Sequence, residues 1–289
     1  FVVATVYLRV CCFFFLMIRR PPISTQSRSS AASDVYKRQV QPGDLVVTIT
    51  NSPAQLRTEA ERVRTLYLQS PSHARAERSA TFHDVAKRTI DILGALLLLI
   101  LLSPLLIAIA AIIRLTSSGP AILIQERVGK GGRIFPFFKF RSMYNDTDRS
   151  ADIRFAREYI NGNHTAIAAS GGVFKPANDK RITPIGRIIR KASIDELPQL
   201  FNVLRGEMSL VGPRPSMAYE IDVYKPWHFR RLEVLPGMTG LAQVRGRSSL
   251  TFQQIVSYDI EYIERRSLLL DLQILLQTPM VVFSGRGAR

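Results

Sequence analysis

Two adjacent acidic residues, Asp195 and Glu196, follow directly on a cationic stretch of the chain. A carboxylate that attacks phosphorus needs cations, and often a metal ion, to offset the negative charge of the substrate. The residues just before the acids supply Arg187, Arg190 and Lys191, which could hold a phosphate beside the carboxylates. Two neighbouring acids also allow one to attack while the other holds the metal. The pattern is therefore compatible with phosphoryl transfer.

The same residues also have a structural interpretation. Ser193 and Glu196 have the spacing of a capping box, in which a serine and a glutamate three residues later satisfy the first backbone N–H groups of a helix. Acidic residues are also favoured at the positive end of a helix dipole. On spacing alone, catalysis and helix capping both remain open.

Other cations are candidates for binding phosphate. Arg214 stands between two prolines in Gly212-Pro213-Arg214-Pro215, and each proline fixes its own φ and pushes its predecessor toward extended geometry. Arg214 is therefore presented at low entropic cost. Lys139 and Arg141 lie two residues apart in a β-rich run, so they project to one face, although such pairs are more often solvated. The candidate phosphate-binding residues are Arg190, Arg214, Lys139 and Arg141.

These residues must be positioned by a chain whose most apolar segment covers residues 92–113 without a charge. At ~1.5 Å per residue, this run is long enough to cross a hydrocarbon layer of about 30 Å. Pro104 lies in its middle, where it removes the hydrogen bond to the carbonyl of Ile100 and predicts a kink or break. Ser103 can donate its hydroxyl to the freed carbonyl.

Both flanks of the apolar run are basic, with Lys87 and Arg88 before it and Arg114 after it. A crossing helix usually has one cationic side, whereas two cationic sides favour a segment that enters the membrane and returns to the same face. A kinked transmembrane helix stays open as the alternative, and a buried helix of a soluble core is disfavoured because the run has no polar face. The hairpin candidates are Ser103, Pro104, Lys87, Arg88 and Asp91.

The rest of the chain predicts a mixture of helices and short strands. Residues 121–128 and 133–140 are β-rich and joined by a glycine-containing loop, which indicates a β-hairpin. Thr183-Pro184 has the order of a helix start, and Ser193 begins a further unit with apolar residues at helical spacing. Residues 267–283 are typical of an amphipathic interfacial helix. We therefore expect an α+β fold, membrane-embedded and monotopic.

Composition and length bound the organisation of the chain. The 289 residues carry a formal charge of +16, which favours nucleic acid, an anionic membrane surface or phosphorylated substrates as partners. We interpret residues 1–39, which contain both cysteines, as a non-native read-through segment. Residues 40–84 are expected to be the remnant of an upstream domain plus a linker, and residues 85–289 the catalytic domain. The histidines lack metal-ligand spacing, and no phosphate loop, dinucleotide motif or nucleic-acid-binding module is present.

Taken together, several motifs resemble one family. They are KRTIDILGALLLLILLSPLLI, QERVGKGG, FKFRSM, SIDELPQLFNVLRGEMSLVGPRP, LPGMTGLAQVRGR and YDIEYIERRSLLLDLQILLQT, in this order. The chain thereby resembles the monotopic phosphoglycosyl transferases, which are bacterial sugar transferases. The resemblance covers residues 85–278, and the Asp-Glu-Leu-Pro-Gln block followed by Gly-Pro-Arg-Pro is its most specific part.

The resemblance implies a reaction and a location. It implies transfer of a sugar-1-phosphate from a UDP-sugar to undecaprenyl phosphate with release of UMP, which starts the assembly of exopolysaccharide or O-antigen glycans. It implies Asp195 as a nucleophile that forms a covalent phosphosugar, Glu196 as a ligand of Mg²⁺, and a re-entrant helix that turns at Ser103-Pro104. The domain would lie at the cytoplasmic face of the bacterial inner membrane, embedded in the lipid bilayer.

Two alternative functions, from other classes of protein, compete with the sugar transferase interpretation. A basic nucleic-acid-binding protein would explain the charge but not the apolar run, so we expect no nucleic-acid partner. A catalytically inactive membrane scaffold would explain the run but not an intact acidic pair among arginines. The sequence does not name the sugar, and association into a homo-oligomer stays open.

Overall fold

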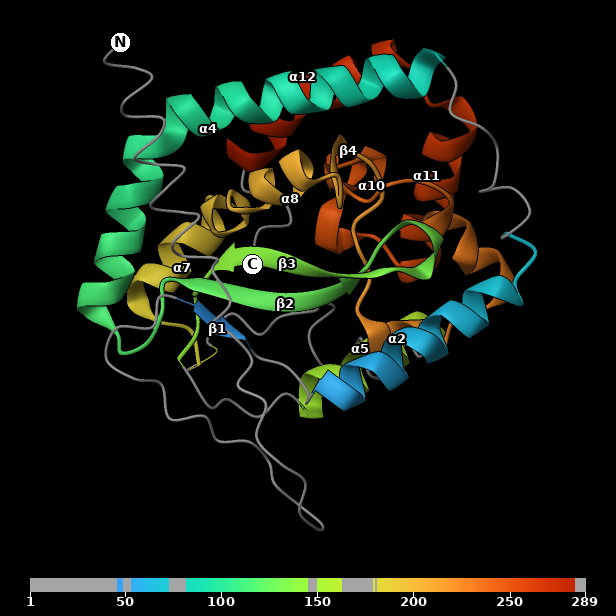
Figure 1. Ribbon diagram of the computed structural model, residues 1–289, viewed down its shortest axis with the longest axis horizontal. Helices are drawn as coiled ribbons and strands as arrows, with labels where there is room; N and C mark the ends of the chain where they lie inside the picture. The colour runs from blue at the N-terminus through green and yellow to red at the C-terminus, as the bar shows by residue number, and fades with distance from the viewer. Residues whose placement is uncertain are drawn as a thin grey trace.

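The computed structural model describes residues 46–48, 53–72, 82–144, 150–162, 179 and 181–283, so residues 1–39 and 163–178 lie outside it. The first part contains β1 (Val46–Thr48), α2 (Pro53–Leu68), α4 (Phe82–Thr116), β2 (Ile122–Val128), η1 (Lys130–Gly132), β3 (Ile134–Phe140) and α5 (Ser150–Asn161). The second part contains α7 (Pro184–Lys191), η2 (Ile194–Glu196), α8 (Gln199–Arg205), β4 (Ser209–Val211), α9 (Ala218–Ile221), η3 (Pro226–Glu233), β5 (Gly237–Thr239), α10 (Leu241–Arg245), η4 (Arg247–Ser249), α11 (Phe252–Arg265) and α12 (Leu268–Phe283). Figure 1 shows helices surrounding a small central sheet.

The central sheet confirms the predicted hairpin and adds a strand to it. β2 and β3 pair antiparallel from Ile122 opposite Phe140 to Val128 opposite Ile134. Gly131 and Gly132 in the connection have φ angles of 68° and 73°, which glycine adopts without steric cost. β1 pairs with β2 in parallel, so the strand order is β1-β2-β3.

One buried side chain joins α8 to the sheet. Asn202 is fully buried, and its Oδ1 accepts a hydrogen bond from the backbone N–H of Phe138 at 3.1 Å. Its Nδ2 donates to the carbonyl of Pro136 at 2.6 Å. The amide thus satisfies two backbone groups of β3 that would otherwise stay unpaired. Because η2 precedes α8 by two residues, this contact also fixes where η2 lies.

The apolar run forms part of α4, which begins earlier than the run and continues past it. A single stripe of α4 faces the protein, and its buried residues are Asp91, Ala95, Leu99, Ser103, Leu106, Ile109, Ala110 and Ile113. The opposite face is apolar but exposed, as at Leu93, Leu97 and Leu101, whose side chains are more than 60% accessible. Within the described residues, α4 is the one helix with the length and composition to cross a membrane.

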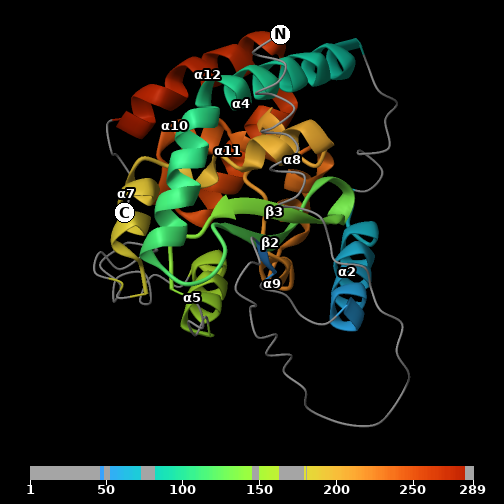
Figure 2. The ribbon, with the colours of Figure 1, turned by 60° about the vertical axis from the view of Figure 1, so that its left-hand side comes forward.

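Helix α4 is bent at its middle. Figures 1 and 2 show it running along one side of the molecule and then turning down an adjacent side. Pro104 lies inside the helix, and Ser103 Oγ donates to the carbonyl of Ile100 at 2.9 Å. This is the carbonyl that Pro104 leaves without its usual partner. The predicted kink and the predicted rescue of Ile100 by Ser103 are both confirmed.

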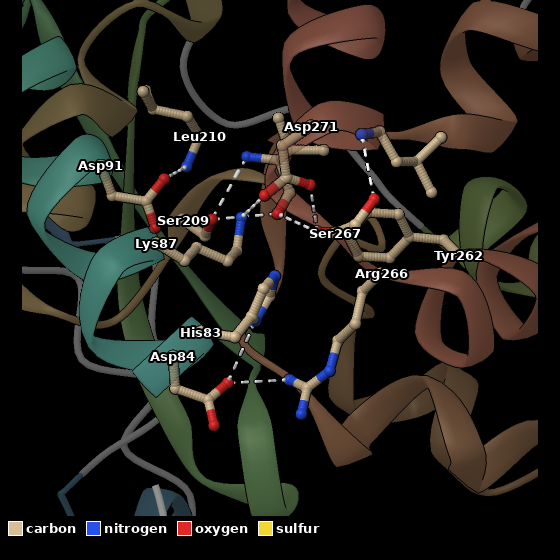
Figure 3. A network of polar contacts seen from close by, with 12 residues as sticks. His83, Asp84, Lys87, Asp91, Ser209, Leu210, Tyr262, Arg266, Ser267 and Asp271 are labelled. Atoms are coloured by element: carbon tan, nitrogen blue, oxygen red, sulfur yellow. Dashed lines mark hydrogen bonds and ion pairs between the residues drawn. The ribbon is translucent and has the colours of Figure 1, made fainter. Parts of the chain in front are cut away.

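A buried polar network fastens the first half of α4 to the rest of the protein (Figure 3). Lys87 Nζ lies 2.6 Å from Asp271 Oδ2 on α12. The Asp271 Oδ1 atom accepts a hydrogen bond of 2.8 Å from the hydroxyl of Tyr262. One turn after Lys87, Asp91 Oδ1 accepts from the backbone N–H of Leu210 on β4 at 3.0 Å. The network holds α4 against α12 and β4.

Arg88 is also bound inside the protein. Its guanidinium donates to the carbonyls of Val203 and Leu204, at 2.7 and 3.1 Å, in the last turn of α8. A cation is favourable there because the last carbonyls of a helix carry partial negative charge. Lys87 and Arg88, which we expected as the cationic flank of the membrane segment, therefore connect that segment to α12 and α8.

The residues before α4 pack against the predicted catalytic domain. Val63 and Tyr67 of α2 are buried in a cluster with Val128, Ile221 and Phe229. Because β1 pairs with β2 as well, the described part of residues 40–84 is integrated into the fold. The prediction that this segment is the remnant of an upstream domain stays untested.

Candidate active site

The acidic pair lies in η2, a single turn between α7 and α8. α7 starts as predicted, because Thr183 Oγ1 accepts a hydrogen bond from the backbone N–H of Gly186 at 2.9 Å. Pro198 follows Asp195 and Glu196 and has no N–H to donate, so α8 begins only at Gln199. The break leaves both acidic side chains partly exposed rather than packed along a long helix.

Ser193 does not form the capping box that its spacing indicates. Its backbone is left-handed, with a φ of 56°, and its side chain makes no capping hydrogen bond. The hydroxyl instead accepts a hydrogen bond from Nη2 of Arg247 at 3.1 Å. The capping interpretation is therefore wrong, because the main chain turns sharply at Ser193 and enters η2 from a non-helical conformation.

Glu196 makes a two-pronged ion pair with Arg214. The Nη2 atom of Arg214 lies 2.7 Å from Oε1 of Glu196, and Nη1 lies 3.3 Å from Oε2. Planar guanidinium and carboxylate groups match in this geometry, which makes such pairs stronger and more directional than single contacts. The structure therefore brings together three predicted site residues, Asp195, Glu196 and Arg214.

The loop that carries Arg214 is fixed at four consecutive carbonyls. Gly237 N donates to the carbonyl of Pro213 at 2.8 Å, and Arg231 Nη2 donates to that of Arg214 at 3.2 Å. Arg127 Nη1 donates to the carbonyl of Pro215 at 3.0 Å, and Val128 N donates to that of Ser216 at 2.8 Å. The segment that carries Arg214 is thus held by β2, η3 and β5, in addition to the stiffness of its own prolines.

Glycines allow β4 and β5 to approach closely behind this loop. A Cβ atom on Gly237 would lie 2.0 Å from the backbone nitrogen of Gly212, and one on Gly240 would lie 2.3 Å from the Gly212 carbonyl oxygen. Both distances are far shorter than any real contact. The Leu-Pro-Gly-Met-Thr-Gly motif therefore has a positioning role, because it supports the backbone on both sides of Gly212.

A buried ion pair stands behind the loop. Arg231 Nε lies 2.7 Å from Oδ2 of Asp259 on α11, and both side chains are almost fully buried. The remaining donors of Arg231 reach the hydroxyl of Tyr224 at 2.8 Å and the carbonyl of Arg214. Burial raises the pKa of Tyr224 to about 12, so its hydroxyl stays protonated and can bond Ser216. Removing Arg231 would leave several buried polar groups without partners.

Electrostatic interactions in the site centre on Arg214. Its pKa is raised chiefly by the charge of Glu196, with Asp195 and Glu220 contributing. The pKa of Arg127 is lowered to about 10, first by burial and then by the positive charge of Arg214. Burial is also the main cause that lowers the pKa of Arg247, and Arg214 adds to it. Three guanidinium groups therefore share the neighbourhood of Glu196.

The other candidate cations lie in different surroundings. Arg141 is buried, and its guanidinium donates to the carbonyls of Ser117 and Ser118 just after α4. It is therefore occupied by the C-terminal end of that helix. Lys139 lies on β3 opposite Leu123, and Arg190 lies on α7, where its charge reaches Asp179.

Arg127, Arg231 and Arg247 are residues of the site that the sequence analysis did not single out. Arg127 stood in the quoted Gln-Glu-Arg-Val motif, and Arg247 in the Val-Arg-Gly-Arg motif. For these two residues the quoted motifs were the available signal, whereas Arg231 lies outside every quoted motif. No local spacing could relate Arg247 to Ser193, because 54 residues separate them.

The acidic residues of the site suit Mg²⁺ in part. Among the described residues, no group of three or more His, Cys, Asp or Glu side chains could hold a metal ion alone. Mg²⁺ is usually bound through one or two carboxylates, with water and substrate phosphates completing the shell. Glu196 supplies such a carboxylate, although it is paired with Arg214 here. The donor set therefore fits an ion that arrives together with a phosphorylated substrate.

Comparison with known proteins places this geometry in a family. Residues 82–285 match the model of the bacterial sugar transferase family. The chain is 44% identical over 208 residues to a galactosyl transferase, CpsE, of Streptococcus agalactiae, covering 72% of this chain and 44% of that protein. It is 42% identical over 213 residues to an undecaprenyl-phosphate galactose phosphotransferase of Salmonella typhimurium, covering 74% and 43%.

A third relative is the UDP-glucose:undecaprenyl-phosphate glucose-1-phosphate transferase of Caulobacter vibrioides. It is 43% identical to this chain over 203 residues, which cover 68% of this chain and 68% of that protein. The chain spans less than half the length of the first two relatives. The family match alone covers more than half of this chain and includes every element from α4 to α12. The chain belongs to the bacterial sugar transferase family.

Proposed function

We propose that this bacterial sugar transferase moves a sugar-1-phosphate from a UDP-sugar to a polyprenyl phosphate, undecaprenyl phosphate, and releases UMP. The observation that carries the proposal is the acidic pair of η2 held beside Arg214, on a loop fixed at four carbonyls. The names of the relatives, which include UDP-glucose and undecaprenyl phosphate, support the choice of donor and acceptor.

In the proposed mechanism Asp195 is the nucleophile. A carboxylate oxygen of Asp195 attacks the sugar-linked phosphorus, and the bond from that phosphorus to the bridging oxygen breaks as UMP leaves. A phosphate oxygen of the polyprenyl phosphate then attacks the same phosphorus and displaces Asp195. Each step exchanges one P–O bond for another, so the protein's main task is to position the groups and offset their charge.

Arg214 and Glu196 carry opposite charges, and we propose that both assist the same transfer. The two side chains form an ion pair in this structure, so each neutralises the other. When a diphosphate enters, the fork of Arg214 can bind phosphate oxygens, because phosphate and carboxylate present similar pairs of acceptors. Glu196 would hold Mg²⁺ when the ion is bound, and the ion would offset phosphate charge.

The exposed apolar face of α4 supports a location of this chemistry at a membrane. We propose that the exposed apolar face of α4 lies in the lipid bilayer and that its bend at Pro104 returns the chain to the side it entered. Both ends of α4 then lie at the cytoplasmic face of the bacterial inner membrane. The phosphate of the lipid-linked acceptor would then reach η2 from the cytoplasmic surface of the membrane.

A half-reaction tests the mechanism. The full chain, purified in detergent, is mixed with Mg²⁺ and a panel of UDP-sugars without polyprenyl phosphate. We expect UMP release and an intact-protein mass increase of one phosphosugar with the preferred donor. Asp195→Asn should lose both, because an amide of nearly the same size is a poor nucleophile. Glu264→Gln, an exposed acid-to-amide change on α11, is the matched control.

The outcomes separate three possibilities. An adduct in the wild-type protein and in Glu264→Gln, but not in Asp195→Asn, supports the covalent mechanism. UMP release that strictly requires the acceptor, with no adduct, replaces it by direct transfer. A protein that turns over no UDP-sugar even with acceptor would contradict the proposed reaction as a whole.

A further inference from the structure

Two non-glycine residues in the described part of the chain have a positive φ, and they bind each other. Ser193 has a φ of 56° and Arg247 a φ of 51°. The left-handed conformation costs a side-chain-bearing residue on the order of 1 kcal/mol, and such strain concentrates at functional sites. The hydrogen bond from Arg247 Nη2 to Ser193 Oγ, at 3.1 Å, links the two strained turns. One of them leads directly into Asp195.

The guanidinium of Arg247 is only partly used by this contact. Its Nη1 atom is buried and has no hydrogen-bond partner among the described residues. The Nε atom of Arg127 is in the same condition. A buried guanidinium N–H without an acceptor is costly, and in native proteins it calls for an explanation such as an absent ion.

Both unpartnered donors belong to the cationic neighbourhood of the acidic pair. The charge of Arg247 interacts with those of Glu196 and Arg214, and the charge of Arg127 interacts with the same two residues. Arg214 has a carboxylate partner in Glu196, whereas its positive charge lowers the pKa of Arg127 and of Arg247. An anion bound at Arg247 Nη1 would satisfy this buried donor and offset the repulsion between Arg247 and Arg214.

We propose that Arg247 binds a phosphate oxygen of the donor through Nη1 while its Nη2 holds Ser193. One guanidinium would then connect the diphosphate to the main chain that leads into Asp195. The inference rests on the proposed function for the identity of the donor, a nucleoside diphosphate sugar. It adds a binding residue that lies on η4, outside the cations of α7 and β3 considered from sequence.

A purely structural role would have a different signature. An arginine that only braced Ser193 would need one donor, and lysine or glutamine could replace part of that contact. Bidentate use of the planar fork explains why arginine is present and why one of its terminal nitrogens stays buried without a protein acceptor. The two roles separate when Ser193 and Arg247 are changed independently.

The test compares Arg247→Gln, Arg247→Lys and Ser193→Ala in the full chain in detergent. Binding of UDP and of inorganic pyrophosphate is measured by calorimetry with Mg²⁺, and KM and kcat are measured for UMP release. We expect Arg247→Gln to weaken both ligands at least ~tenfold and to raise KM. Arg247→Lys should also weaken them, because an ammonium cannot bridge Ser193 and a phosphate in fixed geometry. Arg265→Lys, an exposed change on α11, is the control.

Ser193→Ala decides between binding and bracing. We expect it to keep the affinity for UDP within ~threefold and to lower kcat instead, because it frees the turn before Asp195 without removing the phosphate contact. Unchanged UDP affinity in both Arg247 variants, or the same loss in Ser193→Ala as in Arg247→Gln, would overturn the proposal. If Arg247→Gln does not fold, Arg247→Lys gives the answer.

The result is independent of whether the proposed reaction is correct. UDP and pyrophosphate bind without any chemical step, so their affinities report on Arg247 even for a protein that turns over no UDP-sugar. Conversely, turnover with wild-type affinities in both Arg247 variants leaves the reaction in place and removes Arg247 from the donor site.

Discussion

Arg214 contacts Glu196 through both terminal nitrogens, and the proposed reaction requires it to exchange this partner for a phosphate. Arg214→Lys keeps the charge but loses the fork, so we expect kcat/KM for UMP release to fall at least ~tenfold, equivalent to about 1.4 kcal/mol. Arg265→Lys on the exposed side of α11 should leave it unchanged. Wild-type kinetics in Arg214→Lys would show that the ion pair is dispensable.

His228 predicts how stability depends on pH. It is fully buried, its Nδ1 accepts a hydrogen bond from the backbone N–H of Lys225, and burial followed by the charges of Arg231 and Lys225 lowers its pKa from 6.5 to about 4. The unfolded chain therefore binds a proton that the folded chain rejects between these values. Stability from this group is complete above pH 6.5 and is lost as the pH falls toward 4, by at most about 3 kcal/mol.

The measurement compares thermal unfolding of the wild-type protein and His228→Asn in detergent at pH 7 and pH 5. Asparagine keeps an acceptor for the N–H of Lys225 but does not titrate. The variant should be less stable at pH 7, because the smaller side chain packs less well, yet lose less on acidification. Parallel pH dependence in the two proteins would contradict the assignment to His228.

The site was predictable from sequence where its parts are local. Asp195 and Glu196 are adjacent in sequence, and the prolines around Arg214 predict a rigid backbone at this residue. The capping spacing of Ser193 gave a wrong prediction, since it says nothing of the residue's left-handed backbone or of its partner Arg247. The hydrogen bonds of Arg141 to the carbonyls of Ser117 and Ser118 were not predictable for the same reason, because they depend on where α4 ends. Contacts between segments that are far apart in sequence are set by the fold, and no residue spacing predicts them.

At the scale of elements, α4 makes a prediction through Pro104. Single cysteines are placed at Phe82 and Leu115, both exposed, in a chain with Cys11 and Cys12 replaced by serine. If the bend returns α4 to one face, an impermeant thiol reagent should label neither site in intact cells and both after permeabilisation. Labelling of only one site in intact cells would establish a crossing helix.

Pro104→Ala supplies the matched variant. It restores an N–H to the carbonyl of Ile100, which Ser103 now satisfies, and so removes the cause of the bend. We expect the cysteine at position 115 to become accessible from outside in a fraction of molecules, with a parallel loss of UMP release in membranes. Unchanged labelling would mean that the contacts of Lys87, Arg88 and Asp91 hold the topology without the proline.

Elements with a local signal were predictable, and their boundaries followed from single residues. The β2–β3 hairpin and the start of α7 at Pro184 agree with expectation. The unit expected from Ser193 instead splits into η2 and α8 at Pro198, whose missing N–H outweighs the apolar spacing that continues across it. The parallel pairing of β1 with β2 had no signal, because the two strands are far apart in sequence.

At the scale of the whole molecule, exposed apolar side chains gather on two helices that lie side by side. Figures 1 and 2 show α12 alongside the first half of α4, and the Lys87–Asp271 pair joins them. The outward residues of α12 are Leu269, Leu272, Leu276 and Met280. Solvated helices rarely expose such a row, whereas an interfacial helix requires it. We therefore expect α12 to set the depth at which the site meets the lipid.

This expectation separates anchoring from catalysis. Leu272→Glu with Leu276→Glu places two charges on the outward face of α12, whose side chains are 53% and 62% exposed and make few contacts to lose. The α4 segment should still keep the protein in the membrane fraction. Turnover of undecaprenyl phosphate in lipid vesicles should fall ~tenfold, because the charges lift α12 out of the interface, while UMP release without acceptor in detergent stays at the wild-type rate.

Gln273→Glu is the matched control, since it adds a charge at an exposed polar position of the same helix. It should leave vesicle turnover unchanged if position on the helix, rather than charge, matters. An equal loss in Gln273→Glu would attribute the effect to repulsion from anionic lipid. Wild-type vesicle turnover in the double variant would place α12 in water. A loss of the detergent half-reaction would mean that α12 acts through the protein rather than through lipid, because Tyr262, which contacts Asp271, also donates to the carbonyl of Val211 just before the Arg214 loop.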